Sequence, residues 1–236
     1  MVSYSKVAMK LLLTNDDGIE APGLQALFEA ARQIGEPIIV APEQTLSGCS
    51  HQVTTDQLIR VREVSPCRFA VCGTPADCVR IGLQVLVPDA AWVLSGINAG
   101  GNLGADVHHS GTVAAARESV LHGWPAVALS HYRKRGLALD WERGAKWAAL
   151  VLRDLVDQPR DPGSFWNVNL PHLLSADADP DIEVCQLDPS PLPLTFRRQE
   201  EGWLYAGDYH QRQRAPGTDV DVCFRGKIAV TRIKLF

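Results

Sequence analysis

The hydrophobic positions of the chain alternate between short continuous runs and runs with helical spacing. Residues 11–13 are three leucines in a row, which predicts a short strand buried on both faces. From Leu24 to Ile34 the apolar positions recur at helical spacing and stop at Gly35, which predicts an amphipathic helix that begins near Pro22. Residues 37–41 predict a second buried strand. A strand, a helix and a strand in this order form a right-handed unit with parallel strands.

The same alternation continues for most of the chain. We predict a pair of strands over residues 58–64 and 68–72, helices over 74–86, 110–123 and 141–155, and strands over 91–94, 126–129 and 165–170. This order is typical of an α/β protein with an open, mostly parallel sheet.

The character of the sequence changes after residue 176. Short strand-like runs over residues 182–187, 203–206 and 227–233 alternate with proline-rich and arginine-rich connections, and no helical periodicity competes with them. We therefore predict a core over residues 9–176 and an extended, β-hairpin-bearing appendage over residues 177–236, together forming a single domain.

Composition and charge narrow the functional classes. Apolar residues make up 46% and charged residues 21% of the 236 residues, as in ordinary globular proteins, and no apolar run reaches membrane-spanning length. The net charge of −4 argues against a duplex nucleic acid as partner and leaves a small anionic substrate possible. The first ten residues contain no apolar core of signal-peptide length, which predicts a cytoplasmic protein.

Two adjacent carboxylates, Asp16 and Asp17, follow the first predicted strand. Like charges this close repel each other, so a pair of ionised carboxylates needs a cation or several hydrogen-bond donors nearby. A hard divalent metal ion is one explanation. The other is a simple turn, since the sequence from Asn15 to Gly18 consists of residues that favour turns.

Further oxygen donors follow the other predicted strands. Ser47 lies in the loop after the second strand, and Asn98 lies in the glycine-rich loop after the strand at residues 91–94. Each of them alone is more simply read as a turn residue. The carboxyl ends of parallel strands meet at one edge of the sheet, where such sheets bind ligands. Asp16, Asp17, Ser47 and Asn98 thus provide an all-oxygen set suited to one Mg²⁺ or Mn²⁺ ion.

Ser110, Gly111 and Thr112 open a predicted helix close to this edge. The free backbone N–H groups at a helix N-terminus accept a phosphate, although Ser110 also fits an ordinary helix cap. A metal beside a phosphate site predicts hydrolysis of a phosphoester by a metal-bound water. His51, His108 and His109 are candidates for the acid or base, but histidines at a surface more often have no such role.

Signatures of other phosphate chemistries are missing from the sequence. It contains no Gly-x-x-x-x-Gly-Lys-Ser/Thr loop, and no Gly-x-Gly-x-x-Gly motif follows the first strand. No cysteine is followed at the appropriate place by arginine, and the acidic pair is Asp-Asp rather than Asp-x-Asp. P-loop, dinucleotide-binding, cysteine-phosphatase and aspartyl-phosphate chemistries therefore lose support.

The sequence resembles the SurE (survival protein E) family of metal-dependent 5'/3'-nucleotidases. The resembling segments occur in the family's order at residues 12–23, 40–48, 73–79, 95–104, 110–115, 168–171 and 217–219. The resemblance implies a Rossmann-like three-layer α/β/α core that hydrolyses nucleoside monophosphates with one divalent metal ion per subunit. It also implies assembly into homodimers or homotetramers.

The resemblance assigns roles to individual residues. It implies catalytic and metal-binding roles for Asp16 and Asp17, with Ser47 and Asn98 as further metal ligands. Phosphate binding would involve Asn98, Ser110, Gly111 and Thr112. The competing hypothesis is a non-catalytic nucleotide-binding module for stress responses, which would keep the same residues as a ligand clamp.

The appendage itself predicts contacts between subunits. Its strands are too few and too interrupted to form an independent core, and exposed strand edges need to be covered. Apolar and aromatic residues that a second subunit would cover are Leu192, Leu194, Phe196, Trp203, Leu204 and Tyr205. The alternative is that the appendage folds back onto its own core.

Overall fold

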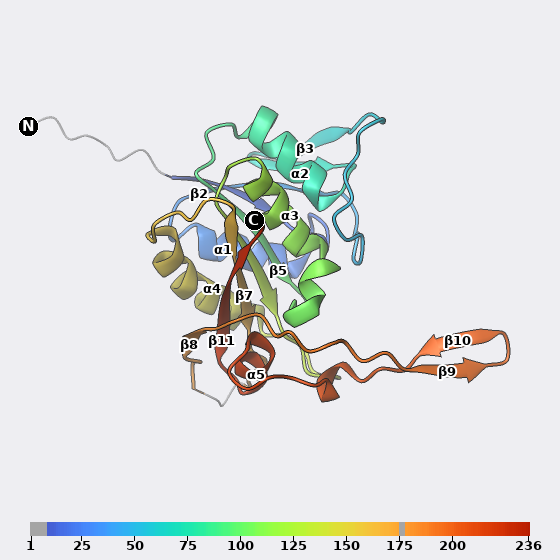
Figure 1. Cartoon of the computed structure of the whole chain (residues 1–236). Coiled ribbons are helices and arrows are strands. Elements are labelled where there is room, and N and C mark those ends of the chain that lie inside the picture. Colours follow the sequence, from blue (N-terminus) through green and yellow to red (C-terminus); the bar gives the residue numbers. More distant parts are fainter. Residues whose placement is uncertain (1–8, 175–177) are drawn as a thin grey trace, which may run out of the picture.

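The computed structural model describes residues 9–174 and 178–236. Within these residues nine strands form one sheet of order β3-β4-β2-β1-β5-β6-β7-β11-β8 (Figure 1). Its strands are β1 (Lys10–Thr14), β2 (Glu36–Pro42), β3 (Val61–Ser65), β4 (Arg68–Val71), β5 (Trp92–Asn98), β6 (Ala126–His131), β7 (Ser164–Leu170), β8 (Ile182–Val184) and β11 (Ile228–Lys234). Only the β3–β4 and β7–β11 pairs are antiparallel among these described strands, so the prediction of a mostly parallel sheet is confirmed.

Helices cover both faces of the sheet and produce the three-layer α/β/α architecture that the family resemblance implied. The α-helices are α1 (Pro22–Ala31), α2 (Pro75–Ile81), α3 (Gly111–Leu121), α4 (Trp141–Val156) and α5 (Asp219–Phe224). Helices α1 and α4 pack on one face, and α2 and α3 pack on the other. None of the helices in the described residues is both long and apolar enough to cross a membrane.

Strand β1 shows how the leucine run specifies its own position. Leu11 and Leu13 lie in the apolar cluster with α1 and α4, whereas Leu12 lies in the cluster with α2 and α3. All three side chains are fully buried, because successive residues of a strand point to opposite faces and both faces are covered. The polar residues that follow β1 therefore lie at the end of the sheet where the parallel strands have their carboxyl ends.

The C-terminal part of the chain returns to the main sheet before and after it forms a hairpin. Strand β11 pairs antiparallel with β7, and β8 pairs parallel with β11. The hairpin of β9 (Phe196–Gln199) and β10 (Gly202–Tyr205) forms a separate two-stranded sheet that projects from the body (Figure 1). The predicted hairpin is therefore confirmed.

We expected no helix in the C-terminal part of the chain, and this expectation was wrong. Helix α5 is only six residues long, too short to show a helical period. Its first residue, Asp219, is buried and its carboxylate accepts hydrogen bonds from the backbone N–H groups of Gly104 and Asp188, both at 2.8 Å. Contacts with distant parts of the chain therefore stabilise this helix.

His131 ends β6 in a buried aromatic cluster beneath α4. Its ring meets the rings of Trp141 and Trp147 edge-on, with centroids 5.9 Å apart in both cases, and its Nε2–H donates to the carbonyl of Pro171 at 3.1 Å. Burial lowers the pKa of His131 from 6.5 to about 4. The ring is therefore neutral in the folded protein at neutral pH.

This pKa predicts an acid-sensitive fold. Between pH 6.5 and about 4 the unfolded chain protonates His131 and the folded protein does not, so the free energy of unfolding falls as the pH is lowered through this window. The full effect is on the order of 3 kcal/mol. Urea unfolding at several pH values should show this slope. The slope should become shallower in His131→Phe and stay unchanged in His108→Gln, which alters an exposed histidine.

Candidate active site

The candidate site lies where the strand order of the sheet reverses. From β1 the chain continues outward through β2 and β4, whereas β5, β6 and β7 extend the sheet in the opposite direction. Loops after β1 and β5 separate at this point, and parallel sheets bind ligands in the crevice that results. Asp16 and Asp17 follow β1, and Asn98 is the last residue of β5.

A cavity of about 360 Å³ opens at this position, and we name it the acidic cavity. The structure brings five of the seven predicted site residues to its wall: Asp16, Asp17, Ser47, Asn98 and Ser110. The other two, Gly111 and Thr112, lie directly behind Asp16 at the start of α3. Loops that are distant in sequence therefore meet as strand-end geometry predicted.

Asp16 is the more buried of the two carboxylates, with 4% of its surface exposed. Its Oδ1 accepts a short hydrogen bond from the hydroxyl of Thr112. Burial raises the pKa of Asp16, the charge of Asp17 raises it further, and the Thr112 hydrogen bond opposes both. A bound cation would favour the ionised form of this carboxylate.

Gly111 allows helix α3 to approach Asp16 this closely. A Cβ atom at this position would lie 2.9 Å from both Cβ and Oδ2 of Asp16 and 3.1 Å from Sγ of Cys49. Real Cβ atoms almost never approach other atoms within 3.0 Å, so any side chain here would displace the carboxylate or the helix. This close contact explains why a glycine occupies position 111, the second residue of the predicted phosphate-binding motif.

Asp17 and the loop that carries Ser47 are held by backbone contacts. Oδ2 of Asp17 accepts from the backbone N–H of Ala99 at 3.2 Å, and the carbonyl of Asp17 accepts from the Thr45 hydroxyl at 2.9 Å. The backbone N–H of Leu46 donates to the carbonyl of Asp16 at 2.8 Å. The loops after β1, β2 and β5 are therefore joined around the carboxylate pair.

Asn98 and Ser110 each have a defined partner. The side-chain amide of Asn98 donates to the carbonyl of Gly100 at 2.9 Å, which leaves its amide oxygen for a ligand. The hydroxyl of Ser110 accepts from the backbone N–H of Val113 at 3.1 Å and caps α3. The ordinary capping role proposed as an alternative for Ser110 is therefore present, and the uncapped N–H groups of the first turn remain available to an anion.

The donors at the acidic cavity suit a hard divalent ion. Across residues 9–174 and 178–236, no group of three or more histidine, cysteine, aspartate or glutamate side chains is placed to hold a metal. The predicted ligand set at the acidic cavity instead combines the carboxylates of Asp16 and Asp17 with the hydroxyl of Ser47 and the amide oxygen of Asn98. Such a set fits Mg²⁺ or Mn²⁺, which commonly retain water ligands, better than Zn²⁺, which favours nitrogen and sulfur.

Several residues of the wall were not identified from the sequence. They are Asn102, Asp106 and Tyr209. Tyr209 comes from the segment after the hairpin, and its hydroxyl donates to Oδ2 of Asp106 at 2.6 Å. The backbone N–H of Asn102 donates to Asn169 at 2.8 Å, and its side chain donates to Ser130 at 2.7 Å. Only the folded sheet brings these partners together.

The three candidate histidines differ in position. His109 lines the acidic cavity and is exposed. Nε2 of His51 lies 2.8 Å from the carboxylate of Glu118, a buried residue of α3 that also contacts His122 at 2.9 Å. His108 is exposed, and its backbone carbonyl accepts a hydrogen bond from the hydroxyl of Ser50 at 3.1 Å. Of the three candidates, His109 is therefore the one that lies at the acidic cavity.

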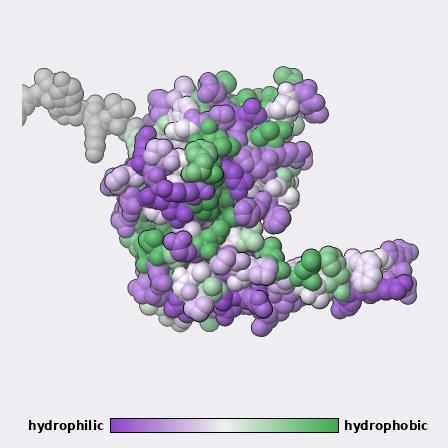
Figure 2. All heavy atoms as spheres, in the orientation of Figure 1, coloured by the Kyte–Doolittle hydropathy of each residue, from purple (hydrophilic) through white to green (hydrophobic). Residues whose placement is uncertain are grey.

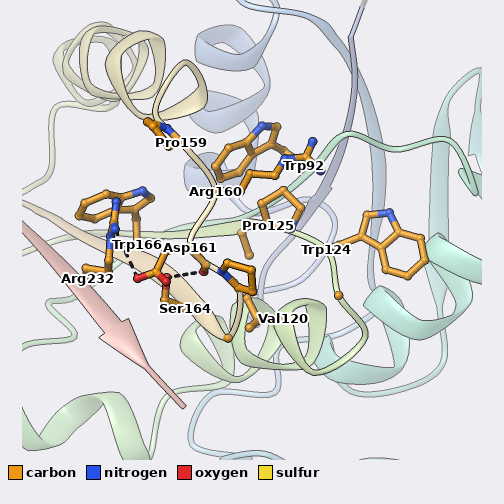
Figure 3. A pocket seen from close by; sticks show the side chains of 14 residues that line it. Trp92, Val120, Trp124, Pro125, Pro159, Arg160, Asp161, Ser164, Trp166 and Arg232 are labelled. Atoms are coloured by element: carbon orange, nitrogen blue, oxygen red, sulfur yellow. Dashed lines mark hydrogen bonds and ion pairs between the residues drawn. The ribbon is translucent and has the colours of Figure 1, made fainter. Parts of the chain in front are cut away.

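A second, more enclosed cavity of about 130 Å³ lies at the opposite edge of the sheet (Figure 3). It is lined by Trp92 and Trp166 at the amino ends of β5 and β7, and by Trp124 before β6. Its one carboxylate, Asp161, pairs with Arg232 at 3.4 Å. This cavity has no pair of unpaired carboxylates in its wall and does not lie at the carboxyl ends of the strands. It therefore does not match the predicted metal and phosphate site.

The fold and the acidic cavity define a class of α/β protein with a carboxylate pair and a helix N-terminus at the point where strand order reverses. Residues 11–190 match the family described as survival protein SurE. This chain belongs to the SurE family.

Individual relatives agree with this assignment. A protein of Nostoc sp. is 50% identical over 228 residues, which cover 96% of this chain and 100% of that protein. The 5'-nucleotidase SurE of Methylobacterium radiotolerans is 44% identical and covers 96% of this chain and 93% of its own length. The crystal structure of the SurE protein from Aquifex aeolicus superposes with a TM-score of 0.85 at 30% identity, covering 96% of this chain and 94% of that one.

The Thr112 hydrogen bond predicts a measurable stability effect. Thr112→Val removes the donor and leaves a buried carboxylate oxygen without it, so we expect the free energy of unfolding to fall by about 1–3 kcal/mol. Urea unfolding near pH 7 measures this. Thr55→Val, at an exposed threonine, is the control. In an Asp16→Ala background, Thr112→Val should lower the free energy of unfolding much less, because the hydrogen-bond acceptor is already missing. An equally large loss in that background would show that Thr112 stabilises the protein by packing alone.

Proposed function

We propose that this chain is a divalent-metal-dependent 5'-nucleotidase that hydrolyses nucleoside monophosphates. The observation that carries the proposal is the contact of the Asp16 carboxylate with the first turn of α3, which joins a cation site to an anion site in one cavity. The name 5'-nucleotidase SurE of several relatives supports the same activity.

Asp16, Asp17, Ser47 and Asn98 would hold the metal ion. When bound, such an ion polarises a phosphoryl oxygen and lowers the pKa of a water molecule that it binds. Asp16 is buried and fixed by Thr112, so its part in the binding set would be rigid. Asp17 is half-buried and held by Ala99, which leaves one face of it open to the cavity.

The first turn of α3 would bind the phosphate. Backbone N–H groups of Gly111 and Thr112 lie at the positive end of an eleven-residue helix, and Ser110 places its hydroxyl at the cavity wall. Asn98 would bind the phosphate as well as the metal. These fixed donors would stabilise the extra negative charge that develops on the phosphoryl oxygens during hydrolysis.

Proton transfer to the leaving alcohol needs an acid near the phosphate. His109 is the candidate, because it is the histidine that lines the acidic cavity. Its exposure would let it take up a proton from solvent after each turnover.

Metal dependence and the role of Asp17 are tested together. With AMP and Mn²⁺ the protein should release inorganic phosphate, and excess EDTA should abolish the release. Asp17→Asn should lower kcat/KM by roughly a hundredfold or more at limiting Mn²⁺, because a carboxylate ligand is lost. Asp56→Asn, which alters an exposed acid, is the control. Wild-type turnover by Asp17→Asn would refute the metal assignment, and tight AMP binding without turnover by the wild type would favour a nucleotide-binding module.

We also propose that the chain forms a homodimer, or a homotetramer built from two such dimers, through the arm, which we define as residues 191–208. Every residue of β9 and β10 is exposed, and the arm extends from the body with hydrophobic side chains at its surface (Figure 2). Exposed fractions reach 82% for Leu194 and 69% for Trp203. An isolated two-stranded hairpin is marginally stable in water, so a second copy of the chain is the occupant that best explains these side chains.

The arm proposal predicts the mass of the particle in solution. Light scattering at micromolar concentration should give at least twice the chain mass of 25.8 kDa. Trp203→Glu should shift the protein toward the monomer without lowering its melting temperature by more than a few degrees, because this side chain is mostly exposed on the hairpin. Leu150→Glu, at a half-exposed leucine of α4, should leave the mass unchanged. A strictly monomeric wild type would refute the proposal.

A further inference from the structure

A second depression adjoins the acidic cavity on the side of α1 and α4. It has a volume of about 470 Å³, within the range of small-molecule sites, and we name it the Trp141 cavity. Asp17 and Ala99 belong to the walls of both cavities. The remaining wall is mostly apolar and includes Pro22, Leu139 and Trp141, with Arg133 as its one basic residue.

Trp141 is held in place before any ligand binds. It is the first residue of α4, and its indole meets the buried ring of His131 edge-on at 5.9 Å. A Cβ atom on Gly23 would lie 3.0 Å from the indole, so the ring packs directly against the backbone at the start of α1. Trp141 is only half-buried, and the rest of its surface lines the cavity.

Gly23 determines the shape of this cavity. A Cβ atom there would lie 1.9 Å from the carbonyl oxygen of Ile97 in β5, which no side chain can tolerate. Helix α1 therefore starts in direct contact with the end of β5, beside Asp17. The apolar wall is thereby brought against the carboxylate pair.

Arg133 adds a positive charge to the same wall. It is exposed on the loop after β6, and no carboxylate pairs with it in the part of the chain that the structure describes. The opposite side of the acidic cavity is different, because Asp106 and Tyr209 bond to each other there and Arg212 pairs with Asp106 at 2.9 Å. An apolar group attached to the phosphate would find a mostly apolar wall on the Trp141 side.

We infer that the nucleoside of the substrate occupies the Trp141 cavity, with its base stacked on Trp141 and its phosphate in the acidic cavity. This inference rests on the proposed function and deepens it, because it names the residues that select a nucleotide over a simple phosphomonoester. Leu139 covers the base from the loop before α4, and Arg133 faces the acceptor atoms of the base or sugar. Trp141 and Leu139 are specificity-determining residues that take no part in the chemical step.

The test compares AMP with glycerol 2-phosphate, which has no base, both with Mn²⁺. Base stacking on an aromatic residue is worth roughly a tenfold change in affinity or more, so Trp141→Ala should lower the ratio of the two kcat/KM values at least about tenfold, mainly through the KM for AMP. Trp141→Phe should restore most of the ratio. Leu139→Ala should lower it less, and Leu137→Ala, an exposed leucine on the same loop outside the cavity, should not change it.

Each outcome of this comparison is decisive. An unchanged ratio in both Trp141→Ala and Leu139→Ala, or an equal loss for the two substrates, would overturn the inference and leave the proposed function intact. If the wild type hydrolyses neither substrate, the proposed function fails. The nucleoside site can then be tested by equilibrium dialysis with adenosine, which measures binding and needs no turnover. Adenosine binding that is retained by Trp141→Ala would then overturn it, and binding that is lost there and kept by Trp141→Phe would support it.

Discussion

The contact between Asp16 and the first turn of α3 is the interaction on which the rest of the site depends. It unites a strand end with a helix start that lies 95 residues later in the chain than Asp16. The contact requires glycine at position 111 for steric reasons and is fixed by the hydroxyl of Thr112. Burial and the neighbouring charge of Asp17 raise the pKa of Asp16, the Thr112 hydrogen bond lowers it, and a bound cation would favour the ionised form. The same arrangement therefore suits the metal binding and phosphate binding that we propose for this site.

Much of this arrangement follows from the sequence, since it depends on local rules. The leucine run predicts a strand covered on both faces, and a polar residue after a parallel strand must lie at the sheet edge. These rules predict that Asp16, Asp17 and Asn98 lie near one another, and all three line the acidic cavity. The loop after β2 was placed in the same way, and Ser47 does line the acidic cavity. Their roles as ligands stay predictions.

The features that the sequence did not indicate are those that depend on contacts between distant segments. Tyr209 follows the hairpin, and it reaches the acidic cavity because Arg212 and Asp106 form a buried ion pair across more than 100 residues. Helix α5 has no period of its own and is stabilised by the bonds that Asp219 accepts from Gly104 and Asp188. Trp141 was predicted only as a helix residue, because the direction of its indole depends on how closely α1 approaches β5. No local pattern in the chain encodes these distances.

The two layers of helices also divide the chemistry of the site. The acidic cavity faces the start of α3, where backbone N–H groups and oxygen donors gather, and the Trp141 cavity faces the starts of α1 and α4, where the wall is apolar. The wall shared by the two cavities is formed by Asp17, from the loop after β1, and by Ala99, which directly follows β5. Since Asp17 and Ala99 are the lining residues common to both cavities in the described chain, changes at Trp141 and at Thr112 act on separate sets of contacts. Energetic effects at sites that share no partners usually add. Under the proposed function, recognition of the phosphate and of the group attached to it would therefore change separately, while the sheet that carries both stays the same.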